Sequence, residues 1–114
     1  VMSIFKRQKD NKEPLSIVEP GYQTRDFVHV SDVVYANVLA SQRELETYGE
    51  VFNVGTGVGT ECQTVADLIS DYQIMIPARP GEVMHSRANI DKIQKTLGWK
   101  WSIKVIDWIK KNLK

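Results

Sequence analysis

The apolar residues of this chain fall into two alternating kinds of segment, and this alternation constrains the fold more than any other feature. Runs of four residues, three of them apolar, occur at 15–18, 51–54 and 73–76, and such short runs are typical of strands. Elsewhere apolar residues recur every three or four positions, which is the spacing of amphipathic helices. The alternation indicates an α/β fold. The chain has 114 residues, so we expect one domain over 1–114.

Capping residues and glycines set the expected helix boundaries. Serine, threonine and asparagine favour the N-cap because their side chains accept a hydrogen bond from a free backbone N–H. Gly98 stands where a left-handed glycine commonly ends a helix. The predicted helices are 1–9, a helix capped by Ser31 and ending near 43, a short one capped by Thr64 through Ile69, 90–97 capped by Asn89, and a last one capped by Ser102.

The remaining segments are assigned to strands and loops. Residues 26–30 are a further strand candidate, with Val28 and Val30 apolar. Residues 51–54 are predicted to be a strand buried on both faces. Turn chemistry at 19–22 and two irregular segments, 55–60 and 77–81, separate the strands and helices. We expect the tryptophans at 99, 101 and 108 to belong to the core.

Charge and cysteine content exclude several classes of protein. The net charge is +1, from 15 basic and 14 acidic residues, whereas nucleic-acid binders are usually far more basic. Lys110, Lys111 and Lys114 gather near a predicted helix end, where the helix dipole favours them. No apolar run approaches the roughly 20 residues of a membrane span. With Cys62 as the one cysteine and two distant histidines, we expect no disulfide, no metal site, a buried thiol and a cytoplasmic protein.

The glycines at 55, 57 and 59 allow two interpretations. They lie between a predicted strand and a predicted helix, where a loop can hold a phosphate group with its backbone N–H groups. The dinucleotide fingerprint, however, needs its third glycine where Thr60 stands, and an acidic residue at the end of the next strand, where Ile76 and Pro77 stand. The alternative is a tight structural turn, which the spacing favours.

Two arginines and a glutamate suggest a ligand site. Arg79 lies between two prolines, and a guanidinium in a rigid loop suits bidentate phosphate binding. Glu82 follows closely and can accept two hydrogen bonds from a ribose diol. Arg25 directly precedes the strand candidate at 26–30, and its simplest interpretation is a surface pair with Asp26. The residues alone therefore permit either a phosphate-and-ribose site or ordinary surface pairs.

Three ordered blocks of sequence narrow the choice. The blocks QTRDFVHVSDVVYANVLA, VFNVGTG and PARPGEV, followed by an aspartate–lysine helix and LGWKW, resemble the C-terminal part of the extended short-chain dehydrogenase/reductases. The resemblance is greatest to UDP-glucose 4-epimerases and their nucleotide-sugar epimerase/dehydratase relatives, and it covers essentially the whole chain. It implies the substrate-binding part of a Rossmann-type enzyme, without the Rossmann half.

The resemblance also implies roles for individual residues. The arginines of the RDF and PARPGE blocks, here Arg25 and Arg79, contact the nucleotide diphosphate in that family. The acidic residue of the PARPGE block, here Glu82, holds the ribose. The strand before the turn lines the uracil pocket, and its residues here are Leu15, Ile17 and Val18. The NVGTG block is structural in the family.

Two elements of the family's chemistry are missing from these residues. The family holds NAD with a glycine fingerprint in its N-terminal Rossmann half, and it uses a Tyr-x-x-x-Lys pair as catalyst. Four residues after the tyrosines stand Asp26, Leu39, Phe52 and Ile76, so no such pair exists. We therefore expect a UDP-sugar-binding portion that has no cofactor and no catalysis of its own, whereas the complete enzyme would use NAD. We also expect a homo-oligomer, or a missing Rossmann half as partner. The alternative is a structural or assembly remnant that binds nothing.

Overall fold

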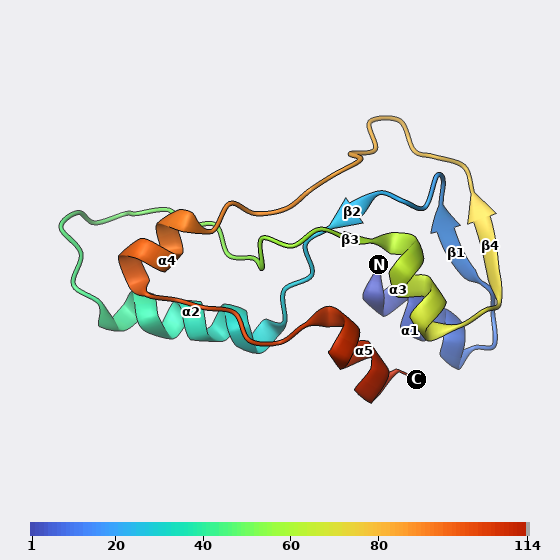
Figure 1. The fold of residues 1–114 in the computed structure, drawn as a ribbon, viewed down its shortest axis with the longest axis horizontal. Helices are drawn as coiled ribbons and strands as arrows, with labels where there is room; N and C mark the ends of the chain where they lie inside the picture. The colour runs from blue at the N-terminus through green and yellow to red at the C-terminus, as the bar shows by residue number, and fades with distance from the viewer. Residues whose placement is uncertain (114) are drawn as a thin grey trace.

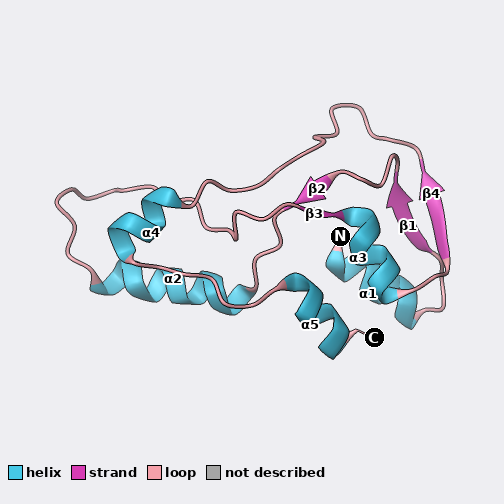
Figure 2. Ribbon diagram, in the orientation of Figure 1, coloured by secondary structure: helices cyan, strands magenta, loops and turns pink. Residues whose placement is uncertain are grey.

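A short parallel sheet lies at one end of the molecule (Figures 1 and 2). The computed structural model describes residues 1–113. Strand β1 (Leu15–Val18) pairs in parallel with β4 (Gln73–Ile76), so that Leu15 lies opposite Gln73 and Val18 lies opposite Ile76. Both strands have the predicted bounds. Because parallel neighbours need a crossover connection, all the intervening chain runs between them, including helix α3 (Cys62–Ile69).

Three helices form a first hydrophobic core together with this sheet. They are α1 (Met2–Asp10), α3 and α5 (Val105–Asn112). Each fully buried aliphatic or aromatic side chain contributes about 1.5–3 kcal/mol of transfer free energy. The buried members of this first core are Phe5, Leu15, Ile17, Val65, Ala66, Ile69, Ile109 and Leu113.

A second hydrophobic core lies at the other end of the molecule, between α2 (Val30–Gln42) and α4 (Asp91–Leu97). Its buried residues are Ala36, Ile93, Leu97 and Trp99. Gly98 ends α4 with a φ of +66°, as predicted for the glycine after this helix. Trp99 is fully buried, and Trp101 and Trp108 pack against the second and the first core respectively, which confirms the predicted role of the tryptophans.

Two polar connections join the ends. Strand β2 (Thr24–Arg25) pairs antiparallel with β3 (Thr60–Glu61) between the two ends of the molecule (Figure 1). Asp32 of α2 accepts hydrogen bonds from Ser102 and from the backbone N–H of Ile103, and its carbonyl oxygen accepts one from Trp99. The resulting shape is elongated, with a radius of gyration of 16.6 Å. About 13 Å is expected for a globular domain of this length.

Two predicted strands are absent from the described part of the chain. Residues 26–30 do not form a strand, because β2 ends at Arg25 and helix α2 already begins at Val30. Residues 51–54 are irregular, and Val51 is 77% exposed rather than buried on both faces. A strand needs a neighbour for its backbone groups. The second segment instead packs Phe52 and Val54 against the second core.

Several predicted caps are also wrong. His29 caps α2, and its ring accepts the hydrogen bond from the Ser31 N–H. Glu61 precedes α3, so Thr64 lies inside that helix.

The predicted caps of the last two helices have different outcomes. Asn89 does accept a hydrogen bond, from the Asp91 N–H, although α4 begins one residue later than predicted. Ser102 donates its hydroxyl to Asp32 instead of capping α5. Of the three C-terminal lysines, Lys114 lies outside the described residues.

Candidate functional site

A small hollow of about 150 Å³ lies beside the carboxyl end of β1. Its wall is apolar on the side of β1 and α1, and charged on the side of β2 and the loop that follows β4. Ligands of open α/β sheets commonly bind beyond the carboxyl ends of the strands. Its lining residues include Ile17, Val18, Arg25, Cys62, Arg79 and Glu82.

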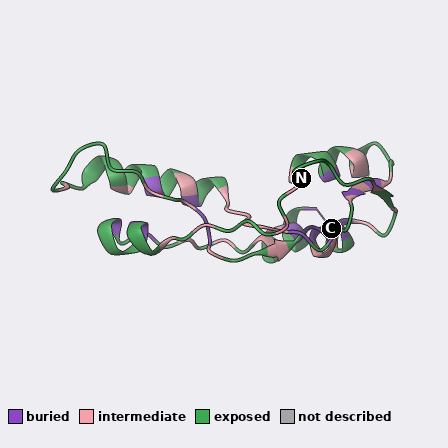
Figure 3. Cartoon of the chain, turned by 90° about the horizontal axis from the view of Figure 1, so that it is seen from above, coloured by how far each residue is buried: buried purple, intermediate pink, exposed green. Residues whose placement is uncertain are grey.

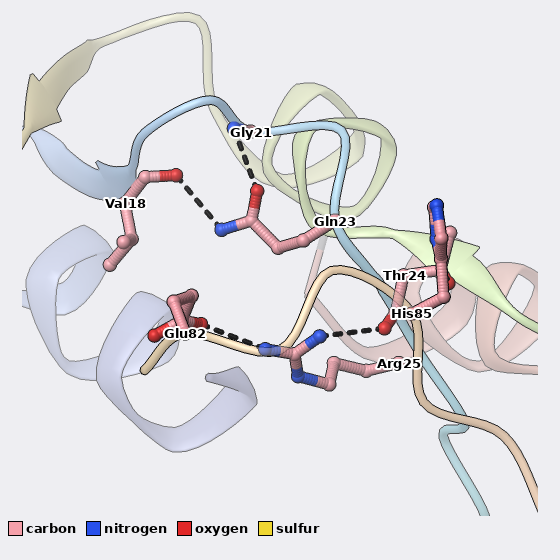
Figure 4. Close-up of polar contacts among 7 residues, drawn as sticks. All are labelled: Val18, Gly21, Gln23, Thr24, Arg25, Glu82 and His85. Carbon is pink, nitrogen blue, oxygen red and sulfur yellow. Dashed lines mark hydrogen bonds and ion pairs between the residues drawn. The ribbon is translucent and has the colours of Figure 1, made fainter. Parts of the chain in front are cut away.

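Gln23 fixes the turn that brings β2 to this hollow (Figure 4). Its side-chain amide is buried, donates to the Val18 carbonyl at 2.9 Å and accepts from the Gly21 N–H at 2.7 Å. Gly21 has a φ of +91°, a conformation that favours glycine. No sequence pattern marks Gln23 as important, because its role depends on a turn whose geometry only the fold defines.

Arg25 and Glu82 pair with each other at the charged side of the hollow. The Nη2 of Arg25 donates to Oε1 of Glu82 at 2.7 Å, and its Nη1 donates to the carbonyl of Thr24 at 2.8 Å. Both side chains are about a quarter exposed, at 27% and 24%. The predicted surface pair between Arg25 and Asp26 is wrong, because Asp26 has other partners.

The segment after Glu82 is held against β2 by backbone hydrogen bonds. The Thr24 N–H donates to the Met84 carbonyl at 2.8 Å, and the Ser86 N–H donates to the Thr24 carbonyl at 3.2 Å. His85 lies beside Thr24, with its Nδ1 3.0 Å from the threonine hydroxyl (Figure 4). These contacts fix the position of the backbone from which Glu82 reaches Arg25.

Arg79 lines the same hollow from the loop after β4. It is exposed, and within residues 1–113 its side chain has no hydrogen bond or ion pair in the structure. A turn closes directly after it, because the Glu82 N–H donates to the Arg79 carbonyl at 3.1 Å and Gly81 has a φ of +77°. The structure thus brings Arg25, Arg79 and Glu82 to one hollow.

The three predicted residues of β1 do not all reach the hollow. Ile17 and Val18 line it, whereas Leu15 is fully buried in the first core and is not part of its wall. Cys62, which the sequence treats as a buried thiol, is 7% exposed and does line the hollow. Burial raises the pKa of this thiol despite the nearby Arg25 charge, which favours the protonated, unreactive form.

The glycine loop holds a carboxylate of the protein itself. Asp26 accepts hydrogen bonds from the backbone N–H groups of Thr56, Gly57 and Ala88 and from the Thr56 hydroxyl. A Cβ at Gly55 would lie 2.7 Å from both Asp26 and Ala88, which explains the glycine. Because the N–H groups of Thr56 and Gly57 already bind Asp26, the structural interpretation of the loop is favoured over a phosphate site.

Neither a metal-binding cluster of side chains nor a membrane-spanning helix occurs within residues 1–113. No group of three or more histidine, cysteine or acidic side chains there is placed to hold a metal ion. None of the helices in that range has the length and hydrophobicity needed to cross a membrane.

Comparison with known proteins identifies the class to which this fold belongs. The profile of the NAD-dependent epimerase/dehydratase family matches residues 1–55. The UDP-glucose 4-epimerase of Mycolicibacterium smegmatis is 31% identical over an alignment of 119 positions, gaps included, and the alignment covers 99% of this chain and 37% of that protein.

Solved structures agree with this result. The UDP-glucose 4-epimerase of Thermotoga maritima, solved with UDP-glucose, is 33% identical, with a TM-score of 0.82 over 95% of this chain and 36% of its own. The UDP-glucuronic acid 4-epimerase of Bacillus cereus, solved with UDP-glucuronic acid and NAD, is 26% identical, with a TM-score of 0.79 over 91% and 35%.

These likenesses define an extended short-chain dehydrogenase/reductase of the epimerase type. The chain belongs to the NAD-dependent epimerase/dehydratase family. The chain spans only part of the length of its curated relatives, and in three of them that part is between 30% and 39%.

Proposed function

We propose that this chain is the C-terminal, nucleotide-sugar-binding portion of an NAD-dependent epimerase/dehydratase such as a UDP-glucose 4-epimerase. One observation carries the proposal. Arg25, Arg79 and Glu82, which come from separate stretches of sequence, line one hollow whose opposite wall is the apolar end of β1. The two family structures described above were solved with UDP-sugars, which supports a ligand of this class.

The chemistry of these residues matches a nucleoside diphosphate. A diphosphate needs positive groups that converge from different segments, and Arg25 and Arg79 supply two planar, bidentate donors. Glu82 can accept hydrogen bonds from ribose hydroxyls. Ile17 and Val18 offer an apolar surface for the base. The sugar lies beyond the diphosphate in this arrangement, and none of these contacts selects which sugar it is.

The size of the hollow fits an incomplete site. Its volume of about 150 Å³ is below the roughly 300–1,000 Å³ of ligand pockets. In our proposal these residues form one wall, and the remaining two thirds of the enzyme form the other. That part would also hold NAD, which accepts a hydride from the sugar and returns it. Alone, this chain holds the nucleotide and catalyses nothing.

A titration of the full chain with UDP, followed by NMR, tests the proposal. We expect saturable amide shifts that gather at Ile17, Val18, Arg25, Cys62 and Glu82. We expect a dissociation constant on the order of millimolar, or about 4 kcal/mol of binding free energy, because half the site is missing. Shifts confined to the end of the molecule formed by α2 and α4 would contradict the assignment.

A structural or assembly role without ligand binding is the second candidate. The exposed valines of α2 favour it, since Val30, Val34 and Val38 are 69%, 54% and 43% exposed. Much of this helix is coloured as exposed in Figure 3. Exposed apolar surface of this kind usually marks a contact with another protein. The absence of saturable UDP binding, together with self-association, would favour this second role.

A further inference from the structure

We propose that the ion pair between Arg25 and Glu82 closes the hollow to free pyrophosphate and opens to ligands that carry a diphosphate and a ribose together. The inference rests on the proposed function and extends it. It makes the pair a selectivity device for ribonucleoside diphosphates.

Arg25 and Glu82, which are proposed to bind different parts of a ligand, bind each other in this structure. The Nη2 of Arg25 is 2.7 Å from Glu82 Oε1, while its Nη1 is engaged by the Thr24 carbonyl (Figure 4). Arg79 has no such partner in the described part of the chain. An incoming anion therefore reaches Arg79 directly, but it reaches the full guanidinium of Arg25 only by displacing Glu82.

Displacing Glu82 has different consequences for different ligands. A carboxylate that loses a charge-assisted hydrogen bond while only a quarter exposed is left incompletely solvated. Pyrophosphate offers it no hydroxyl donor, and its negative charge repels the freed carboxylate. A ribose offers hydroxyl donors that replace the lost guanidinium donor. The same displacement is thus unfavourable for the bare anion and compensated for the nucleotide.

The backbone around Glu82 allows a local opening. On one side, Thr24 holds Met84 and Ser86 by backbone hydrogen bonds. On the other side, the turn through Gly81 is exposed, and no atom lies within 4 Å of the space a Cβ would take there. Glu82 lies between the fixed segment and the open turn, so it can leave Arg25 without disturbing β2.

The test compares the full chain with E82Q and with E44Q, using pyrophosphate, UDP and 2′-deoxy-UDP as ligands. Glu44 is exposed and follows α2 by two residues, and α2 extends away from β1 and β4 (Figure 1), so E44Q removes the same charge away from the hollow. We expect E82Q to bind pyrophosphate about three- to fivefold more tightly than the natural chain, since even a well-exposed ion pair is worth up to about that factor and this pair is less exposed. E44Q should leave pyrophosphate binding unchanged.

The ribose arm separates this device from simple charge repulsion. The natural chain should bind UDP about threefold or more tightly than 2′-deoxy-UDP, and E82Q should lose that difference, because the preference requires a hydrogen bond from the 2′-hydroxyl to the carboxylate. If UDP binds but E82Q neither gains pyrophosphate affinity nor loses the ribose preference, the inference is overturned and the proposed function stands. If none of the proteins binds UDP, both are overturned.

Discussion

The carboxylate of Asp26 accepts hydrogen bonds from both the backbone N–H and the hydroxyl of Thr56, at 2.8 and 2.6 Å. The same carboxylate accepts from the Ala88 N–H at 3.1 Å. Asp26 adjoins Arg25, and Ala88 lies in the segment that carries Glu82. This half-buried carboxylate therefore ties the glycine loop to two of the segments that form the hollow.

Replacing Asp26 with asparagine should lower the free energy of unfolding by about 2 kcal/mol, because hydrogen bonds to a charged acceptor are worth about 1.5–3 kcal/mol. Urea denaturation followed by tryptophan fluorescence measures the change. Asp10→Asn is the control, since it removes only an exposed pair with Lys6, worth about 0.5 kcal/mol or less. Equal stability of the two variants would show that Asp26 is not an anchor.

Acid should selectively weaken the connection made by Asp32. Burial of this carboxyl raises its pKa, but the hydrogen bonds from Ile103 and Ser102 outweigh burial and hold the pKa below its ordinary value of 3.8. A carboxyl with a lowered pKa stabilises the fold above its ordinary pKa, and this contribution is lost as the pH falls through the folded value. The stability difference between the natural chain and Asp32→Asn should therefore be constant from pH 7 to 5 and shrink toward pH 3 and below. An undiminished difference at pH 2.5 would contradict this account.

The sequence predicts some of these features for clear physical reasons. The strands at 15–18 and 73–76 are apolar runs that find each other as neighbours, so local pattern and final structure agree. The run at 51–54 has the same pattern but no neighbour, and it packs on the second core instead. His29 caps α2 instead of Ser31, because the helix begins at Val30 and His29 is the residue that precedes it.

The candidate site shows the same division. Arg25, Arg79 and Glu82 could be named from their motifs, and the structure places them at one hollow. The pairing of Arg25 with Glu82, 57 residues away, depends on how β2 packs against the segment after Glu82. No local pattern contains that information. The resemblance implies that Leu15 lines the uracil pocket, whereas its side chain is buried in the first core and does not line the hollow. Leu15 and Ile17 share one face of β1, so the alternation of the strand cannot distinguish them, and only the position of the hollow at the carboxyl end of β1 does.

Self-association is expected through the exposed face of α2. Light scattering should give a mass above that of a monomer for the natural chain, and Val34→Glu should restore the monomer because a charge in an apolar contact is costly. Val51→Glu is the matched control, since Val51 is 77% exposed outside this helix. A monomeric natural chain across a wide concentration range would remove the basis for this prediction.

The chain alone should not interconvert UDP-glucose and UDP-galactose in the presence of NAD. The tyrosines at 22, 35, 48 and 72 have no lysine four residues later, so no lysine at that spacing can lower the pKa of a catalytic tyrosine. Incubation with UDP-glucose and NAD, with a full-length epimerase as positive control, measures this. Turnover above background would refute the prediction.

The most direct test of the central claim is UDP binding by the natural chain, Arg25→Ala, Arg79→Ala and Arg43→Ala, measured by NMR titration. Arg43 is exposed at the far end of α2 and controls for the loss of one positive charge. The account predicts saturable shifts for the natural chain and Arg43→Ala, and about tenfold or greater weakening for the other two, since each loses charge-assisted hydrogen bonds. No saturable shifts in the natural chain, or equal binding by all four proteins, would contradict the claim that this hollow holds a nucleoside diphosphate.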